Sequence, residues 1–405
     1  MSNGLFILCI LLPVVQSLEN GLGLVPPMGW NSWNAFHCDI NETRIFGAAD
    51  QIVDLKLSEV GYTYLNIDDC WMHNERVDGK YVGDYERFAG GMKNVGDYIH
   101  SKGLRFGIYT SAGEKTCAGY PGSLGHEEID ALTFAEWGVD YLKYDNCYAD
   151  GLPSIDRFPR MRDALNATGR LIYYSLCQWG KEDSWQWAPA VSNSWRTTED
   201  IQPTWKSIRF NFWLSQQHAE RSQPGAWLDP DMLEVGNGGL SFEENKSHFS
   251  LWCLAKSPLL LGMDLYTISE ETYNIVTNTK LIRVNQDPHA SQATCFSGCH
   301  VLADWSILAT RITGGATVVV VINWCDEILT DLTIAGSAVG IVPSKDQKVQ
   351  VIDLWTDEEV GVFGFESLKA VALPAMPAHG CVVYQFNTVT DSSIFIGESS
   401  ATVTV

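Results

Sequence analysis

Residues 139–147 have the sequence Val-Asp-Tyr-Leu-Lys-Tyr-Asp-Asn-Cys, in which an apolar strand leads directly into polar groups. Side chains along a strand alternate between its two faces, so Lys143 and Asp145 point to the same side. In a parallel barrel, the carboxyl ends of the strands carry the catalytic groups. An exposed ion pair at a strand end would leave the same local pattern, so the interpretation depends on the rest of the chain.

The same pattern recurs along the first two thirds of the chain. Between these runs lie segments with helical periodicity, such as 44–60 and 242–256. Alternating strands and helices indicate a parallel sheet with crossover helices, and eight repeats favour closure into a (β/α)8 TIM barrel. The eight apolar runs that finish in polar or acidic residues are 28–33, 62–71, 104–112, 139–147, 171–179, 194–200, 226–233 and 258–265.

The composition changes after Asn-Gln-Asp-Pro at 285–288. The runs 317–323, 350–355 and 381–386 are β-branched or aromatic and lack helical spacing. They predict an antiparallel β-sandwich domain. We therefore expect a barrel over 18–288, a C-terminal β-sandwich over 289–388 and a disordered tail over 389–405.

The first 17 residues resemble a secretory signal peptide, with an apolar run followed by Val15, Gln16 and Ser17. The sequons at Asn41, Asn166 and Asn245 fit such a route as glycosylation sites. No later run is long enough to span a membrane. These features predict a protein that is secreted or held in the lumen of a lysosome or vacuole, and they leave a homodimer open.

The chain is strongly acidic, with 49 acidic against 27 basic side chains and a net charge of −22. This charge argues against nucleic acid or an anionic membrane as a partner, because both repel an acidic surface. A neutral ligand is expected instead. The 15 tryptophans are numerous enough that some can stack on sugar faces, although most of them belong to the core.

Polar groups gather where the predicted strands end. Carboxylates in such number indicate either cation binding or recognition of hydroxyl groups. Calcium sites usually take their ligands from one short loop, which none of these segments provides, so hydroxyl recognition is favoured and we expect neither a metal nor another cofactor. The groups are Trp30, Trp33, Asp68, Asp69, Tyr109, Lys143, Asp145, Gln178, Trp179, Arg196, Glu199, Asp200, Asp229, Asp231 and Asp264.

Hydrolysis of a glycosidic bond requires two carboxyl groups. Asp145 suits the attacking role, because the neighbouring Lys143 is expected to keep it ionised. Asp200 suits the acid role, because like charges and partial burial are expected to raise its pKa. Swapped roles stay open. The assignment predicts an acidic pH optimum, because Asp200 must be protonated while Asp145 is ionised. Glu199 is set aside because adjacent residues of a strand face opposite ways.

Several segments resemble the signature blocks of glycoside hydrolase family 27, the eukaryotic α-galactosidases. The similarity runs in order from about residue 24 to 290 and implies a retaining mechanism, with Asp145 as nucleophile and Asp200 as acid/base. The blocks are Pro27-Met28-Gly29-Trp30-Asn31-Ser32-Trp33, Ile67-Asp68-Asp69-Cys70-Trp71, Lys143-Tyr144-Asp145-Asn146-Cys147, Trp195-Arg196-Thr197-Thr198 with Asp200-Ile201, and Asp229-Pro230-Asp231-Met232.

The resemblance also assigns contacts to the sugar and two disulfides. It implies that Asp68 and Asp69 take the O4 and O6 hydroxyls of galactose and that Lys143 takes O3 and O4. The remaining implied contacts are Arg196 and Asp231 near O2 and O3, Trp33 and Tyr109 along the ring, and a Cys117–Cys147 disulfide against the sugar, with a second disulfide between Cys38 and Cys70. The pairing of the other cysteines stays open.

Two positions depart from the family pattern. Gln178 stands where many members carry an acidic residue, and we expect it to exchange hydrogen bonds with O2. The bulk of Trp179 favours galactose over N-acetylgalactosamine. Leu228 replaces the usual Asn, with no predictable effect. An α-galactosidase is thus expected; α-N-acetylgalactosaminidase, β-L-arabinopyranosidase and a non-catalytic galactose-binding protein are the alternatives.

Overall fold

The computed structural model describes residues 17–289, 291–344 and 346–389. The predicted signal peptide, except Ser17, and the predicted tail, except Val389, lie outside these residues. Within the described ranges, no helix has the length and apolar character needed to cross a membrane.

Eight parallel strands form one sheet, and each predicted run contains one of them. The strand order is β7-β6-β5-β4-β3-β2-β1-β8, so chain neighbours are also neighbours in space. The ring closes after β7, where the Leu233 amide donates to the Leu260 carbonyl over 2.8 Å. The predicted barrel is therefore confirmed. Its strands are β1 (Met28–Asn31), β2 (Tyr64–Asn66), β3 (Arg105–Ser111), β4 (Tyr141–Asp145), β5 (Tyr173–Cys177), β6 (Ser194–Arg196), β7 (Trp227–Asp229) and β8 (Leu259–Leu261).

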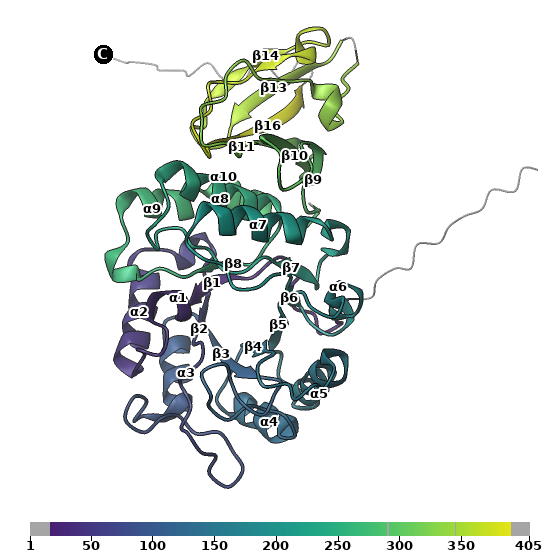
Figure 1. The fold of residues 1–405 in the computed structure, drawn as a ribbon. Coiled ribbons are helices and arrows are strands. Elements are labelled where there is room, and N and C mark those ends of the chain that lie inside the picture. The colour runs from purple at the N-terminus through teal and green to yellow at the C-terminus, as the bar shows by residue number, and fades with distance from the viewer. Residues whose placement is uncertain (1–16, 290, 345, 390–405) are drawn as a thin grey trace, which may run out of the picture.

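Helices surround this sheet on its outer side (Figure 1). The helix predicted over 44–60 is broken, because Lys56 takes a left-handed conformation with φ of 57°. The helices are α1 (Trp33–Phe36), α2 (Glu42–Asp54), α3 (Gly91–Ser101), α4 (Glu127–Glu136), α5 (Ser154–Ala167), α6 (Ser184–Trp187), α7 (Trp205–Gln216), α8 (Phe242–Leu254), α9 (Glu270–Val276) and α10 (Thr279–Asn285). Short 3₁₀ turns are η1 (Ser58–Val60), η2 (Ala188–Ala190), η3 (Ala219–Arg221), η4 (Leu265–Thr267), η5 (Gly336–Val339) and η6 (Ser367–Lys369).

Strand alternation divides the barrel into an apolar jacket and a layered interior. On β4, the outward Tyr144 packs edge-on against Phe158 of α5 with ring centroids 5.5 Å apart. The inward residues begin with Tyr141, which stacks on Tyr173 at 5.0 Å and forms a separate apolar cluster with Tyr64. Tyrosines thus fill the bottom of the barrel, and the polar residues of the same strands are left at its carboxyl end.

The second domain is antiparallel throughout, as predicted. Its main sheet has the order β14-β13-β16-β11-β10-β9, and β12 pairs with β15 separately. One apolar cluster, which includes Val319, Val351 and Phe386, fills the space between the sheet and these smaller elements. The strands are β9 (Thr294–Ser297), β10 (Trp305–Arg311), β11 (Thr317–Asn323), β12 (Thr333–Ile334), β13 (Lys348–Asp353), β14 (Glu359–Phe363), β15 (Val371–Ala372) and β16 (Cys381–Val389).

The two domains meet along helices α7, α8 and α10 of the barrel, beneath the strands β11 and β16 (Figure 1). Hydrogen bonds join them directly. Ser247 donates to the His379 carbonyl at 2.6 Å, and Arg209 donates to the Ala303 carbonyl at 2.7 Å. This contact lies on the outer side of the barrel, so the carboxyl ends of the strands stay accessible.

The close approach of β1 to β2 leads to a prediction about Gly29. A Cβ atom at this position would lie 2.2 Å from the Tyr64 carbonyl oxygen, which belongs to the barrel backbone and cannot rotate away. We expect Gly29→Ala to lower the free energy of unfolding by about 3 kcal/mol in denaturant titrations. Gly364→Ala is the matched control, because a Cβ there has no neighbour within 4 Å. Equal stability of the two variants would contradict this packing.

Candidate active site

A cavity of about 450 Å³ opens at the carboxyl ends of the strands. It has the size and position that small-ligand sites have in barrels. Most of the residues predicted to act on or bind the ligand line it: Trp33, Asp68, Asp69, Tyr109, Cys117, Lys143, Asp145, Trp179, Arg196, Asp200 and Asp231. Gln178 does not, and neither do three of the strand-end groups, Trp30, Asp229 and Asp264.

One wall of the cavity is built on an ion pair between β4 and the loop after β2. The Lys143 ammonium lies 2.8 Å from Asp68, whose same oxygen also accepts a hydrogen bond from the Asn31 amide at 2.8 Å. Burial disfavours the ammonium and is the largest single effect, but the negative charges of Asp68, Asp145 and other nearby groups together outweigh it and raise the pKa of Lys143 well above its usual value. Lys143 is therefore a fixed cation, and its direct partner is Asp68.

Asp145 is almost completely buried at the end of β4. One carboxylate oxygen accepts a hydrogen bond from the Tyr109 hydroxyl at 3.0 Å, and the other accepts from the Asn146 amide at 2.8 Å. Burial raises the pKa of Asp145 to about 6, although the nearby charge of Lys143 acts in the opposite direction. The expectation that Lys143 keeps this carboxylate fully ionised underestimated desolvation, which is the larger effect.

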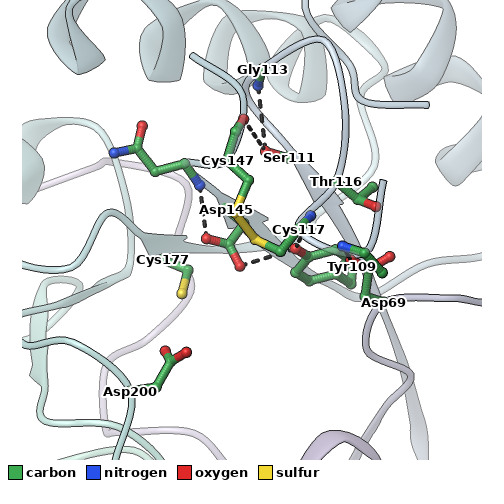
Figure 2. The surroundings of a disulfide bond; sticks show 12 residues. Asp69, Tyr109, Ser111, Gly113, Thr116, Cys117, Asp145, Cys147, Cys177 and Asp200 are labelled. Atoms are coloured by element: carbon green, nitrogen blue, oxygen red, sulfur yellow. Dashed lines mark hydrogen bonds between the residues drawn. A yellow bond between two sulfur atoms is a disulfide. The ribbon is translucent and has the colours of Figure 1, made fainter. Parts of the chain in front are cut away.

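The Cys117–Cys147 disulfide lies beside the Asp145 carboxylate, and Cys177 and Asp200 lie below that carboxylate in the view (Figure 2). It joins the loop after β3 to the loop after β4. In this position the Ala118 amide donates to Asp69 at 2.8 Å. Burial raises the pKa of Asp69 despite that hydrogen bond. The disulfide thus fixes the loop that orients one of the predicted hydroxyl-binding carboxylates.

The opposite wall is organised by Arg196, the last residue of β6. Its guanidinium lies 2.8 Å from Asp231 and 3.1 Å from Asp200. Burial raises the pKa of Asp200, but the charges of Arg196 and Lys143 outweigh it, and the net pKa is lowered. The predicted raised pKa of Asp200 is therefore wrong for the unliganded site, because its closest charged neighbour is a cation.

Two further predictions about this region are wrong. Gln178 is completely buried and donates to the Lys181 carbonyl and not to the cavity. It follows Cys177 on β5, and Cys177 is the residue that points toward Asp145 and Arg196. The strand β6 ends at Arg196, so Glu199 and Asp200 lie in a loop and strand alternation does not separate them. Both line the cavity.

Sequence reasoning missed other residues of the cavity wall. They lie in the segments that follow β1, β6 and β7. Their neighbours in the sequence, Trp33, Asp200 and Asp231, had been identified, and this was the available signal. They are Asn34, His37, Ile201, Gln202, Pro203, Met232, Glu234 and Asn237. Cys147, the predicted disulfide partner of Cys117, lines the cavity as well.

The structure also places other predicted features, namely further cysteine pairs, a possible metal site and Leu228, the second departure from the family pattern. Cys38 is bonded to Cys70, and Cys295 to Cys299. Among the described residues, Cys117, Asp145 and Cys147 are the one group with three potential metal-ligand atoms within 4.8 Å of one another. Because both sulfurs are already bonded, this group offers no thiolate to a metal. Leu228 points away from the cavity into the apolar core.

The barrel and its cavity define the class of the protein. Paired carboxyl groups at the strand ends, surrounded by side chains suited to hydroxyl groups, are the site of a glycoside hydrolase. The family model described as alpha galactosidase A matches residues 25–287. The model described as alpha galactosidase C-terminal beta sandwich domain matches residues 303–386. The chain belongs to glycoside hydrolase family 27, the α-galactosidase family.

Individual relatives agree with this membership. The chain is 46% identical over 368 residues to alpha-galactosidase 3 of Arabidopsis thaliana, covering 91% of this chain and 83% of the relative. It is 43% identical over 369 residues to the alpha-galactosidase of Cyamopsis tetragonoloba, covering 90% and 87%. The crystal structure of alpha-galactosidase I from Mortierella vinacea superposes with a TM-score of 0.85 at 37% identity, covering 91% of this chain and 98% of that one.

Proposed function

We propose that the protein hydrolyses terminal, non-reducing α-galactosyl residues of oligosaccharides and glycoconjugates with retention of configuration. Asp145 attacks the anomeric carbon, and Asp200 protonates the leaving oxygen and then activates water. The observation that carries this proposal is that the two carboxyl groups line one cavity and sit in unlike surroundings. Asp145 is buried, whereas the side chain of Asp200 is 69% exposed. An exposed carboxyl can exchange protons with water, as an acid/base must.

The wall around Lys143 supplies the recognition of the sugar. Asp68 and Asp69 have oxygens that accept from hydroxyl groups, and Lys143 donates between them. An axial O4 hydroxyl can satisfy these buried groups, whereas an equatorial one would leave them unpaired. We propose that Asp68, Asp69 and Lys143 select galactose, that Arg196 and Asp231 hold the O2 and O3 side, and that Trp33, Tyr109 and Cys117 line the ring.

Trp179 argues for galactose against N-acetylgalactosamine. Its backbone φ is 65°, and the next residue, Gly180, has no space for a side chain because a Cβ would lie 2.1 Å from the Thr197 carbonyl oxygen. The loop is therefore fixed against its neighbour, and the ring cannot easily withdraw from an acetamido group. We expect nitrophenyl α-galactoside to be cleaved at least about tenfold faster than the α-N-acetylgalactosaminide or β-L-arabinopyranoside. A preference for either of the latter would favour the corresponding alternative.

Protonation of the pair follows from the two environments. The free enzyme with one proton on the pair holds it mainly on Asp145, because the pKa of Asp145 is about 6 and that of Asp200 is lowered. The reactive form carries the same proton on Asp200. The two singly protonated forms have the same total charge. A change of pH therefore alters the total amount of singly protonated enzyme, but it does not alter the proportion that carries the proton on Asp200. Activity therefore declines above about pH 6, where that proton is lost, which retains the acidic optimum.

Processing and assembly are proposals of a coarser kind. We propose export through the secretory route and a domain boundary near residue 289, between α10 and β9. Of the three sequons, Asn166 is exposed, whereas Asn41 caps α2 and Asn245 donates to the Ser241 carbonyl. Asn166 is therefore the sequon whose amide is freest for a glycan. The homodimer stays a prediction.

Substitution of the two carboxyl groups tests the assignment. Asp145→Asn keeps the shape but removes the nucleophile, and we expect kcat to fall at least about a thousandfold. Asp200→Asn should slow natural substrates similarly. With an activated nitrophenyl α-galactoside, whose leaving group needs little acid assistance, added azide should restore the turnover of Asp200→Asn and give α-galactosyl azide, because azide replaces the activated water on the face from which that water attacks the covalent intermediate. Azide rescue of Asp145→Asn should give β-galactosyl azide, because azide then attacks from the side of the missing nucleophile. The opposite products, β-galactosyl azide from Asp200→Asn and α-galactosyl azide from Asp145→Asn, would reverse the roles.

The hydrogen bond from Tyr109 gives a prediction about pH. A donor favours the ionised form of Asp145, so Tyr109→Phe removes it and raises the pKa of Asp145 further above about 6. The alkaline limb of the pH profile of kcat/KM should move to higher pH. The maximum of the profile should fall, because a smaller fraction of the singly protonated enzyme carries its proton on Asp200. The profile is measured with nitrophenyl α-galactoside from pH 3 to 8. A downward shift of the alkaline limb would contradict the assignment.

A further inference from the structure

Three side chains on the cavity wall between β7 and β1 form a hydrogen-bonded unit that the proposed chemistry does not use. Glu234 accepts one hydrogen bond from the Asn34 carboxamide at 2.7 Å and another from the Asn237 carboxamide. Glu234 follows β7, Asn34 belongs to α1, and all three residues line the cavity. Because both carboxamides direct their nitrogen atoms toward Glu234, their oxygen atoms are left for other partners.

The side-chain oxygen atoms of Asn34 and Asn237 have no hydrogen bond to any of the described residues. Glu234 itself is only 3% exposed. No cation among the described residues pairs with Glu234. Burial raises its pKa to about 7, and the nearby Asp231 acts in the same direction. A buried carboxyl group without a counter-charge is costly, so the presence of Glu234 on this wall indicates a positioning role.

The backbone leaves room for this unit. A Cβ atom at Gly262, just after β8, would lie 3.1 Å from the Cβ of Asn34 and 3.3 Å from the Nδ2 of Asn237. Any larger residue at Gly262 would push the two carboxamides away from Glu234. The three loops therefore bring the carboxamides together at one place on the rim.

This place is on the side of the cavity where Asp200 lies. Asp200 comes from the loop after β6, the strand next to β7, and the Ile201 amide donates to Asp231 at 2.8 Å, three residues before Glu234. The group that protonates the leaving oxygen must face the leaving group. A wall that continues from Asp200 toward Glu234 is therefore the wall along which the leaving group lies.

We propose that Asn34, Glu234 and Asn237 form the site that binds the hydroxyl groups of the leaving sugar, with Glu234 as the positioning residue that sets which carboxamide atoms face the cavity. This inference rests on the proposed function. The ligand class is a leaving group with hydroxyl groups, such as a hexose, in contrast to an apolar aglycone.

The protonation of Glu234 changes what the unit offers. The ionised carboxylate accepts from both nitrogens and leaves two carboxamide oxygens toward the cavity. The protonated carboxyl group donates one hydrogen bond, so one carboxamide must turn its oxygen inward and present its NH2 to the ligand. The titratable groups around Glu234 are Asp231 on the same loop, His248 of α8, which accepts the Glu234 amide at 3.0 Å, and His37, which lines the cavity. Burial lowers the pKa of His248 to about 3, so it stays neutral.

The test compares two substrates that carry the same galactosyl group but different leaving groups. The ratio of kcat/KM for galactosyl-α-1,6-glucose to that for nitrophenyl α-galactoside isolates the leaving-group site, because the galactose contacts cancel. Asn34→Leu and Asn237→Leu remove a carboxamide at similar volume, and each should lower this ratio by about threefold to tenfold, the value of one or two hydrogen bonds. Asn94→Leu is the matched control, since Asn94 also donates to a glutamate, Glu42 at 2.6 Å, but on the outer helix α3.

Glu234→Gln separates positioning from mere packing. The ratio depends on pH in every variant, because the glucose leaving group needs the proton on Asp200 more than nitrophenol does. In the unaltered enzyme the ionisation of Glu234 should add a further change of the ratio between pH 6 and 8, and Glu234→Gln should lack this further change. The same pH dependence of the ratio in Glu234→Gln and in the unaltered enzyme, or Asn34 and Asn237 variants that slow both substrates equally, would overturn the proposal. If the unaltered enzyme cleaves neither substrate, the proposed function fails instead. Thermal unfolding confirms that each variant used is folded.

Discussion

The site depends on the balance between crowded carboxyl groups and two buried cations at the mouth of the barrel. Seven carboxyl side chains line the cavity, whereas Lys143 and Arg196 are its lysine and arginine. Each cation contacts a carboxylate other than Asp145: Lys143 pairs with Asp68, and Arg196 pairs with Asp231. These pairs leave the buried Asp145 carboxylate without a cation in direct contact. A carboxylate that is poorly stabilised as an anion is a more reactive nucleophile, because forming a bond removes its charge.

Rigid supports keep this arrangement in place. The tyrosines beneath it fill the barrel, and the Cys117–Cys147 disulfide holds the loop that carries the Ala118 amide to Asp69. The second domain packs on the outer helices of the barrel. Recognition and chemistry therefore take place on groups whose positions are set before a ligand arrives, which avoids the cost of ordering them during reaction.

The sequence was sufficient for the features set by strand periodicity. Lys143 and Asp145 share a face because they are two residues apart, and the eight strand ends meet because parallel strands share a direction. It was insufficient where a strand stops. Whether β6 reaches Asp200 and whether Gln178 points inward depend on hydrogen bonds between neighbouring loops. The lowered pKa of Asp200 required the distance to Arg196, and the contact between Asn34 and Glu234 joins residues 200 positions apart.

The central claim is that Asp145 becomes bonded to the sugar during turnover. The most direct measurement uses an activated 2-deoxy-2-fluoro α-galactoside, which slows release of the intermediate, followed by digestion and mass spectrometry of the labelled peptide. The account predicts one fluorogalactosyl group on the peptide that contains Lys143-Tyr144-Asp145, attached to the carboxyl group of Asp145. A label on Asp200 or another side chain would contradict it.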